Sequence, residues 1–234
     1  MLAVRNLLRR LRRDESGLTL MELVATIPAT IAVLVAVGTM TVTGVHSQAR
    51  ISNRVDANQR ARPVMTQILQ MLHSSCVAPR IVPVLAGSTG TSISFLSKSG
   101  STVSPTPDLH VVSLSGTTLT DTIYPATGGA APTWTFSGTA SSSRQLLTNV
   151  AAPGGVMFRY YQFVSGSISP TPLTTPLSAT DAAHTANVDV SFASSPSKGV
   201  STLDPNSPLT LDDSVDLRLE AAGQYPNQDN LPCV

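Results

Sequence analysis

A long, almost uncharged run near the N-terminus places the first constraint on how this chain can fold. Between Leu18 and Val45 the only ionisable side chain is Glu22. An apolar run of more than about 20 residues is long enough to cross a bilayer as a helix. Five arginines lie before this run, within the first thirteen residues. Because basic flanks stay in the cytoplasm, the pattern predicts a membrane-inserted helix with the rest of the chain on the outer side.

This segment differs from an ordinary secretory signal peptide. Such a peptide has an apolar core of about 7–15 residues, followed by a cleavage site of small residues. Here the apolar run is longer than that core, and Gly17 comes before the run rather than after it. The residues around this glycine are Ser16-Gly17-Leu18-Thr19-Leu20-Met21-Glu22.

This string resembles the recognition sequence of type IV prepilins and type II secretion pseudopilins. The resemblance covers the basic leader, Gly17, the apolar Leu18, Thr19, Glu22 and the apolar helix. It implies that an aspartic prepilin peptidase removes residues 1–17 on the cytoplasmic side of the membrane. It also implies that Leu18, the new N-terminus, is N-methylated.

Glu22 requires a partner or a function in such a setting. A carboxylate in the bilayer core costs about 2.5–3.5 kcal/mol on insertion scales. After cleavage Leu18 would carry an α-ammonium one helical turn away, and the two groups would relieve each other's desolvation within one helix or between neighbouring subunits. The resemblance implies that Glu22 pairs with the N-terminus of an adjacent subunit during assembly, in a region that includes Thr19. The alternative is a glutamate that extends to the bilayer surface from a plain signal anchor.

The helical pattern continues beyond the apolar run. Ile51 and Val55 lie four apart in a polar stretch, and a stripe of apolar residues then recurs at helical spacing. The residues of the stripe are Val64, Met65, Ile68, Leu69 and Leu72. A helix from Leu18 to about Ser75 would be roughly 85 Å long, so its second half must belong to the globular domain. Pro28 and Pro63 interrupt the pattern, and Pro28 is expected to kink or loosen the helix.

After Cys76 the periodicity changes from helix to strand. Short runs of β-branched and aromatic residues alternate with clusters of Gly, Pro and Ser, which is typical of antiparallel strands. The predicted strands are residues 81–85, 92–96, 109–114, 117–124, 133–136, 156–164, 188–192 and 215–219. Residues 165–180 and 194–208 are predicted to be loops.

The predicted fold is therefore α+β, with a long N-terminal helix packed on a C-terminal antiparallel sheet, as in pilins. The expected organisation has four parts. They are the leader 1–17, the transmembrane or filament-core helix 18–45, its amphipathic continuation 46–75, and the β-rich domain 76–234.

The chain has two cysteines, Cys76 and Cys233. Export to an oxidising compartment favours a disulfide between them. Closing a loop of about 157 residues would constrain the unfolded chain by about 5 kcal/mol. Two free thiols are the alternative. The two cysteines lie 157 positions apart and form no local Cys/His cluster, so their spacing does not indicate a metal site.

No motif indicates an enzyme or a resident cofactor. The four histidines, His46, His73, His110 and His184, follow no metal-binding or catalytic spacing, and no nucleophile elbow or phosphate-binding loop is present.

Two further groups of residues each allow two interpretations. Asp204, Asp212, Asp213 and Asp216 form either a solvated acidic loop or a calcium loop of the kind that some pseudopilins have, although their spacing differs from an EF-hand. The aromatic residues Trp134, Tyr160 and Tyr161 are either core residues or, if exposed, a surface on which sugars or bases stack.

Net charge and length complete the expectation. Without residues 1–17 the chain has ten basic and twelve acidic residues, a net charge of −2, so a nucleic-acid partner is not expected. The length of 234 residues exceeds that of most major pilins, which favours a minor pilin of a type IV pilus. The alternatives are a type II secretion pseudopilin and a membrane-anchored binding module, such as an adhesin or a DNA-uptake receptor.

The expected partners are the prepilin peptidase, other pilin or pseudopilin subunits, the inner-membrane assembly platform and the membrane itself. The expected location is the cytoplasmic membrane, with a single pass and an extracytoplasmic C-terminal domain. The chain would then move into a cell-surface or periplasmic filament.

Overall fold

A computed structural model describes residues 19–76, 81–97, 106–130, 133–197 and 208–217. The predicted leader, the cleavage site at Gly17 and Leu18, Asp204 and Cys233 lie outside the described residues. The chain divides into two compact units, Met1–Gln48 and Ala49–Val234. The boundary falls within one helix, close to the predicted division between residues 45 and 46.

Helix α2 (Leu20–His73) is 54 residues long and continues through both Pro28 and Pro63. The prolines therefore do not end the helix, because a proline removes one backbone donor while the hydrogen bonds of the neighbouring turns remain. In the second unit α2 buries a stripe at spacings of one, three and four residues. The stripe contains Ala49, Asn53, Ala57, Ala61, Val64, Met65, Ile68 and Leu72.

The first sheet is a four-stranded antiparallel meander with the order β1-β2-β3-β6. Its strands are β1 (Ser92–Ser97), β2 (Asp108–Ser115), β3 (Thr118–Tyr124) and β6 (Ser142–Thr148). A separate hairpin is formed by β4 (Ala126–Ala130) and β5 (Thr133–Phe136) between β3 and β6.

The second sheet has the order β11-β10-β8-β9, and β7 also pairs with β10. Its strands are β7 (Val150–Ala151), β8 (Phe158–Val164), β9 (Ser167–Ile168), β10 (Thr185–Ser194) and β11 (Leu209–Asp216). A 3-10 turn, η1 (Pro153–Gly155), precedes β8, and helix α3 (Ala179–His184) precedes β10.

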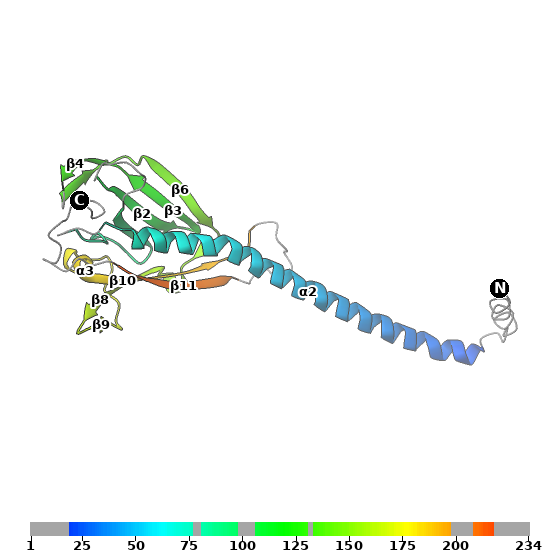
Figure 1. The fold of residues 1–234 in the computed structure, drawn as a ribbon. Helices are drawn as coiled ribbons and strands as arrows, with labels where there is room; N and C mark the ends of the chain where they lie inside the picture. Colours follow the sequence, from blue (N-terminus) through cyan, green and yellow to red (C-terminus); the bar gives the residue numbers. More distant parts are fainter. Residues whose placement is uncertain (1–18, 77–80, 98–105, 131–132, 198–207, 218–234) are drawn as a thin grey trace, which may run out of the picture. The chain divides into compact units, whose positions relative to one another are not determined.

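The core of the second unit lies where both sheets meet α2. Ile68 of α2, Phe95 of β1 and Phe192 of β10 are fully buried members of one hydrophobic cluster. Figure 1 shows the C-terminal half of α2 running between the β2–β3–β6 sheet and the β10–β11 sheet. The chain is thus α+β, with a long apolar N-terminal helix and a C-terminal antiparallel sheet domain, as the sequence predicted.

Several predicted strands are confirmed, and others are wrong. Residues 81–85 form a single isolated bridge, between Val84 and Phe95, instead of a strand. The last strand begins at Leu209 rather than at Val215, because the acidic stretch between them pairs along β10. Four short strands, β4, β6, β7 and β9, were not predicted. Their sequences, such as Ser-Ser-Arg-Gln-Leu-Leu-Thr in β6, lack clear alternation.

Helix α3 lies at the end of the predicted loop 165–180 and was also missed. A local signal for it exists, because Ser178 and Asp181 have the spacing of a helix N-cap. In the structure the Ser178 hydroxyl accepts a hydrogen bond of 3.0 Å from the backbone N–H of Asp181.

Candidate functional site: the exposed apolar segment of α2

The first unit consists, as far as it is described, of helix with no buried face. Residues 19–48 are all exposed. Large apolar side chains point outward along this segment, among them Leu23, Ile27, Ile31, Leu34, Val37, Met40 and Val45. A continuous apolar surface of this length marks a membrane or a protein contact. Within the described residues, α2 is the one helix that is long and apolar enough to cross a membrane.

Five of the six threonines of this segment satisfy their own hydroxyl groups. Each donates a hydrogen bond to a backbone carbonyl three or four residues earlier, at distances between 2.8 and 3.2 Å. The threonines are Thr26, Thr30, Thr39, Thr41 and Thr43. An apolar medium offers no water to bond with a hydroxyl, so internal bonding removes the main cost of placing threonine there. The helix is therefore compatible with lipid or with a packed helical core in spite of these polar residues.

The start of α2 has the pattern of a capping box, Thr19-Leu20-Met21-Glu22. The Thr19 hydroxyl accepts a hydrogen bond of 3.4 Å from the backbone N–H of Glu22, and the Thr19 carbonyl accepts one of 2.9 Å from the same group. Thr19, which the resemblance assigned to assembly, thus has a local role in beginning the helix.

The carboxylate of Glu22 is available for a contact outside the segment. It lies in the first turn of α2, where the helix dipole favours a negative charge. Within the described part of the chain it forms no hydrogen bond or ion pair. Its predicted partner, the α-ammonium of a processed Leu18, lies outside the described residues. The structure therefore leaves the pairing of Glu22 as a prediction.

Within the second unit, polar contacts fix the part of α2 that begins at Ala49. Asp56 accepts hydrogen bonds from the backbone N–H and the hydroxyl of Ser197, at 2.9 and 3.1 Å. Arg60 donates to the Thr148 hydroxyl at 3.0 Å, at the end of β6. Asn53, on the buried stripe, is fully buried. Together with the apolar stripe, these contacts hold the C-terminal half of the helix in one position on the domain.

Cys76 follows α2 directly and is fully buried. It is disulfide-bonded. The other cysteine of the predicted pair, Cys233, lies outside the described residues. Among the residues that the structure describes, no three His, Cys, Asp or Glu side chains are grouped so that they could hold a metal ion. Asp212 and Asp213 are neighbours on strand β11, so their side chains point to opposite faces of the sheet.

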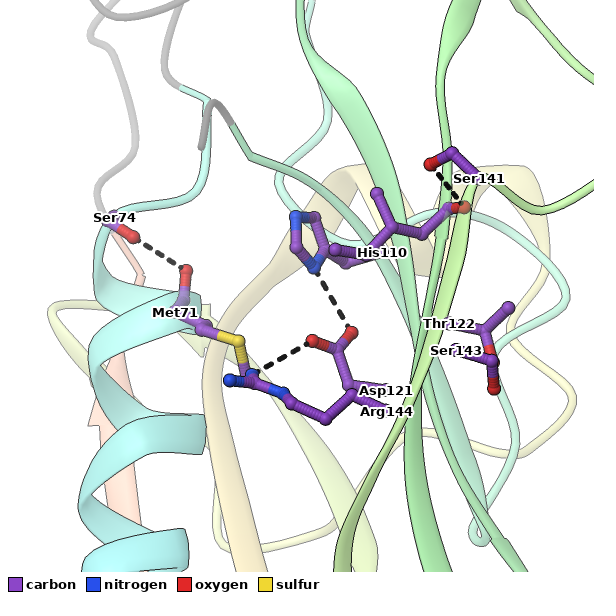
Figure 2. Close-up of polar contacts among 9 residues, drawn as sticks. Met71, Ser74, His110, Asp121, Thr122, Ser141, Ser143 and Arg144 are labelled. Carbon is purple, nitrogen blue, oxygen red and sulfur yellow. Dashed lines mark hydrogen bonds and ion pairs between the residues drawn. The ribbon is translucent and has the colours of Figure 1, made fainter. Parts of the chain in front are cut away.

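A second polar cluster lies inside the first sheet, as Figure 2 shows. His110 of β2 and Asp121 of β3 are joined at 3.1 Å, and the exposed fractions of their side chains are 4% and 1%. Arg144 of β6 reaches the other oxygen of Asp121 at 3.4 Å. The Phe95 ring stacks on His110 with a centroid distance of 5.5 Å. Because the His–Asp pair is closed to solvent, its evident role is to hold the three strands in register.

The three aromatic residues singled out in the sequence, Trp134, Tyr160 and Tyr161, occupy different environments. Tyr160 is buried, and its hydroxyl donates to the backbone carbonyl of Thr89 at 2.8 Å. Burial raises the pKa of Tyr160 well above its usual value. Tyr161 and Trp134 are half-buried. Tyr160 is thus a core residue, whereas Tyr161 lies on the outer face of the second sheet, beside Asp189 and Asn187.

Comparison with protein-family models, with curated proteins and with solved structures gives no significant match.

Proposed function

We propose that this chain is a pilin-type structural subunit, held in the cytoplasmic membrane by α2 and assembled through α2 into an extracytoplasmic filament. The filament is a type IV pilus or, within the same class, a type II secretion pseudopilus. The observation that carries the proposal is the exposed apolar stretch of α2, with one charge, Glu22, in its first turn. The motif around Gly17 supports it, with cleavage between Gly17 and Leu18 by a prepilin peptidase.

The apolar stretch has a use both before and after assembly. In the membrane, lipid covers the side chains between Leu20 and Val45. In a filament, the same side chains pack against the helices of neighbouring subunits, with about 25 cal/mol for each Å² of apolar surface kept from water. Because lipid and helices cover this surface about equally well, the transfer gains little free energy by itself. Extraction therefore requires work from the inner-membrane assembly platform.

Glu22 gives the assembly its register. A carboxylate in an apolar setting seeks an opposite charge, since an unpaired charge there is costly. The α-ammonium of a processed neighbour supplies that charge at one position along the helix. Subunits that are offset along the filament leave both charges unpaired, so the correctly aligned arrangement is favoured.

Glu22→Gln in the full chain tests this role. The variant is expressed with a prepilin peptidase and the assembly components, and filaments sheared from the cells are quantified. The glutamine keeps the shape and loses the charge, so we expect membrane insertion and cleavage to persist. Recovery in filaments is expected to fall by about tenfold, the equivalent of about 1.4 kcal/mol of lost pairing. Thr30→Val is the matched control, because the Thr30 hydroxyl bonds only within its own helix at 2.8 Å.

Two results would contradict the proposal. One is normal recovery of Glu22→Gln in filaments. The other is a wild-type chain that stays in the membrane, uncleaved and outside any filament. The second result would favour a membrane-anchored binding module, whose ligand would then be sought on the outer face of the sheet domain.

A further inference from the structure

A hairpin with apolar side chains at its tip projects from the second sheet. Strand β8 pairs with β10 only from Phe158 to Gln162, and beyond that point it pairs with β9 alone. Ser165 and Gly166 connect the two strands with φ angles of 52° and 88°, the conformation of a tight two-residue hairpin turn. Phe163, Val164 and Ile168 at the tip are 57, 46 and 38% exposed. Three exposed apolar side chains together on a short hairpin indicate a contact surface.

An acidic depression adjoins this tip. It has a volume of about 640 Å³ and is lined by Ile168, Tyr161, Asp189 and Asp212, among others. Asp189 and Asp212 lie on β10 and β11, and one cation, Arg159 on β8, lies 3.6 Å from Asp189. Residues 76–234 contain six basic and ten acidic residues, a net charge of −4 with histidine neutral. The hairpin tip and the depression together are called the acidic face.

One face of α2 has the opposite charge and its own exposed apolar residues. Residues 46–75 contain four arginines and one aspartate, a net charge of +3. Ile51 and Val55 are 63 and 47% exposed, and Arg54 between them is exposed and forms no hydrogen bond or ion pair within the described residues. We call this face of the helix the basic ridge. Its residues follow one another at helical spacing: Ile51, Arg54, Val55, Asn58 and Arg62.

We propose that the acidic face of one subunit binds the basic ridge of a second copy of this chain. The branched side chains of Ile51 and Val55 pack against Phe163 and Ile168, while Arg54 enters the depression toward Asp189 and Asp212. Aromatic and aliphatic anchors flanked by paired charges are the usual centre of a protein–protein contact. The inference rests on the proposed filament function and adds a specific contact between subunits.

Such a contact joins two different surfaces of the same chain. An interface of this kind leaves one free acidic face and one free basic ridge after every addition, so it continues into a helical array unless the rotation closes a ring. The chain would then recur along the filament. That outcome differs from the expectation of a minor pilin in the sequence analysis.

Site-specific photo-crosslinking in the assembled state tests the contact. Phe163 is replaced by the photoreactive residue p-benzoylphenylalanine in the full chain, which is expressed with the peptidase and the assembly components. After irradiation the products are mapped by mass spectrometry. We expect crosslinks from Phe163 to residues 51–62 of a second copy, and a ladder of multimers of this chain.

Charge reversal identifies the ion pair within the contact. Arg54→Glu and Asp212→Lys are each expected to lower the yield of this crosslink by at least about fivefold, because each places like charges together. The double variant is expected to restore the yield to within about twofold of the parent chain. Asp108→Lys, the same change of charge on the other sheet, is the matched control and leaves the yield unchanged.

The outcomes separate this inference from the proposed function. The chain could be cleaved and recovered in filaments while position 163 crosslinks to lipid, to a different protein or to another part of a second copy. That result would overturn the contact and leave the filament function intact. A crosslink that is unaffected by charge reversal also overturns it. A chain that is neither cleaved nor recovered in filaments removes both proposals.

Discussion

At the scale of single residues, the protonation of Asp189 on the acidic face makes the stability of the fold depend on pH. Burial and the nearby Asp212 carboxyl raise the pKa of Asp189 from 3.8 to about 6, although the Arg159 guanidinium opposes the shift. A raised pKa means that the folded state favours the protonated form. The stability that Asp189 contributes is therefore full below about pH 4 and is lost as the pH rises through 6.

Asp189→Asn removes this penalty at neutral pH. We expect the free energy of unfolding of the variant, relative to that of the parent chain, to increase from pH 4 to pH 7.5. The increase is about 1 kcal/mol at most, because solvent screens a partly exposed group. Urea unfolding of the detergent-solubilised protein, followed by circular dichroism at both pH values, measures the difference. If the variant is less stable than the parent chain at pH 7.5, the Arg159 ion pair outweighs burial.

The His110–Asp121–Arg144 cluster yields a second prediction at this scale. Asp121 bonds both neighbours from a fully buried position, so Asp121→Ala removes both contacts at once and leaves a cavity between the strands. We expect a loss of about 3 kcal/mol in the free energy of unfolding. Thr122→Ala, on the same strand but with its hydroxyl bond at the surface, is the control and should cost less than about 1 kcal/mol. Equal effects of the two substitutions would contradict a structural role for the cluster.

The sequence alone did not predict this cluster. His110, Asp121 and Arg144 come from three different strands, and they meet only because β2, β3 and β6 pair in a particular register. Asp121 lies directly opposite Arg144, and His110 reaches it diagonally from β2. Strand β6 was not recognised, so Arg144 could not be placed. Glu22 could be chosen as a candidate from the sequence alone, because a lone charge in an apolar run is visible without any tertiary information.

At the scale of elements, α2 changes its environment along its length. Ile68 is fully buried in the core, whereas Ile51 on the same helix is 63% exposed. Ile68→Ala is expected to cost about 3 kcal/mol through lost burial and the cavity left behind. Ile51→Ala provides a matched control with the same chemistry and is expected to cost less than about 0.5 kcal/mol. Chemical denaturation of the full chain in detergent compares the two.

The result for Ile51 also separates folding from assembly. If the basic ridge contacts a neighbour, Ile51→Ala lowers filament recovery while the subunit remains as stable as the parent. A large loss of stability in Ile51→Ala would contradict the exposed position of this residue, and with it the ridge.

The apolar half of the helix stripe was predictable, and the small-residue half was not. Val64, Met65, Ile68, Leu69 and Leu72 were expected on one face; four of them are buried, and Leu69 is half-buried. The same stripe extends back through Ala49, Asn53, Ala57 and Ala61. Alanine is only weakly apolar and asparagine is polar, so neither predicts burial from the sequence. Their burial follows from the close approach of the domain to the helix and becomes visible only in the structure.

At the scale of the whole molecule, the charges are separated along the chain. Five arginines precede the apolar helix, four more follow it, and the sheet domain is acidic. The first group is expected to hold the N-terminus in the cytoplasm. The second and third provide the complementary surfaces proposed for the contact between subunits. The basic leader would thus serve membrane insertion, and the basic helix and acidic domain would serve the later assembly.

The central claim is that the chain is processed after Gly17 and assembles through the helix that begins there. The most direct test is the intact mass and N-terminal sequence of the membrane-purified protein, with and without a co-expressed prepilin peptidase, for the parent chain and for Gly17→Ala. The account predicts a peptidase-dependent start at Leu18, with the added mass of one methyl group, and no cleavage of Gly17→Ala. An intact start at Met1 in the presence of an active peptidase would contradict it.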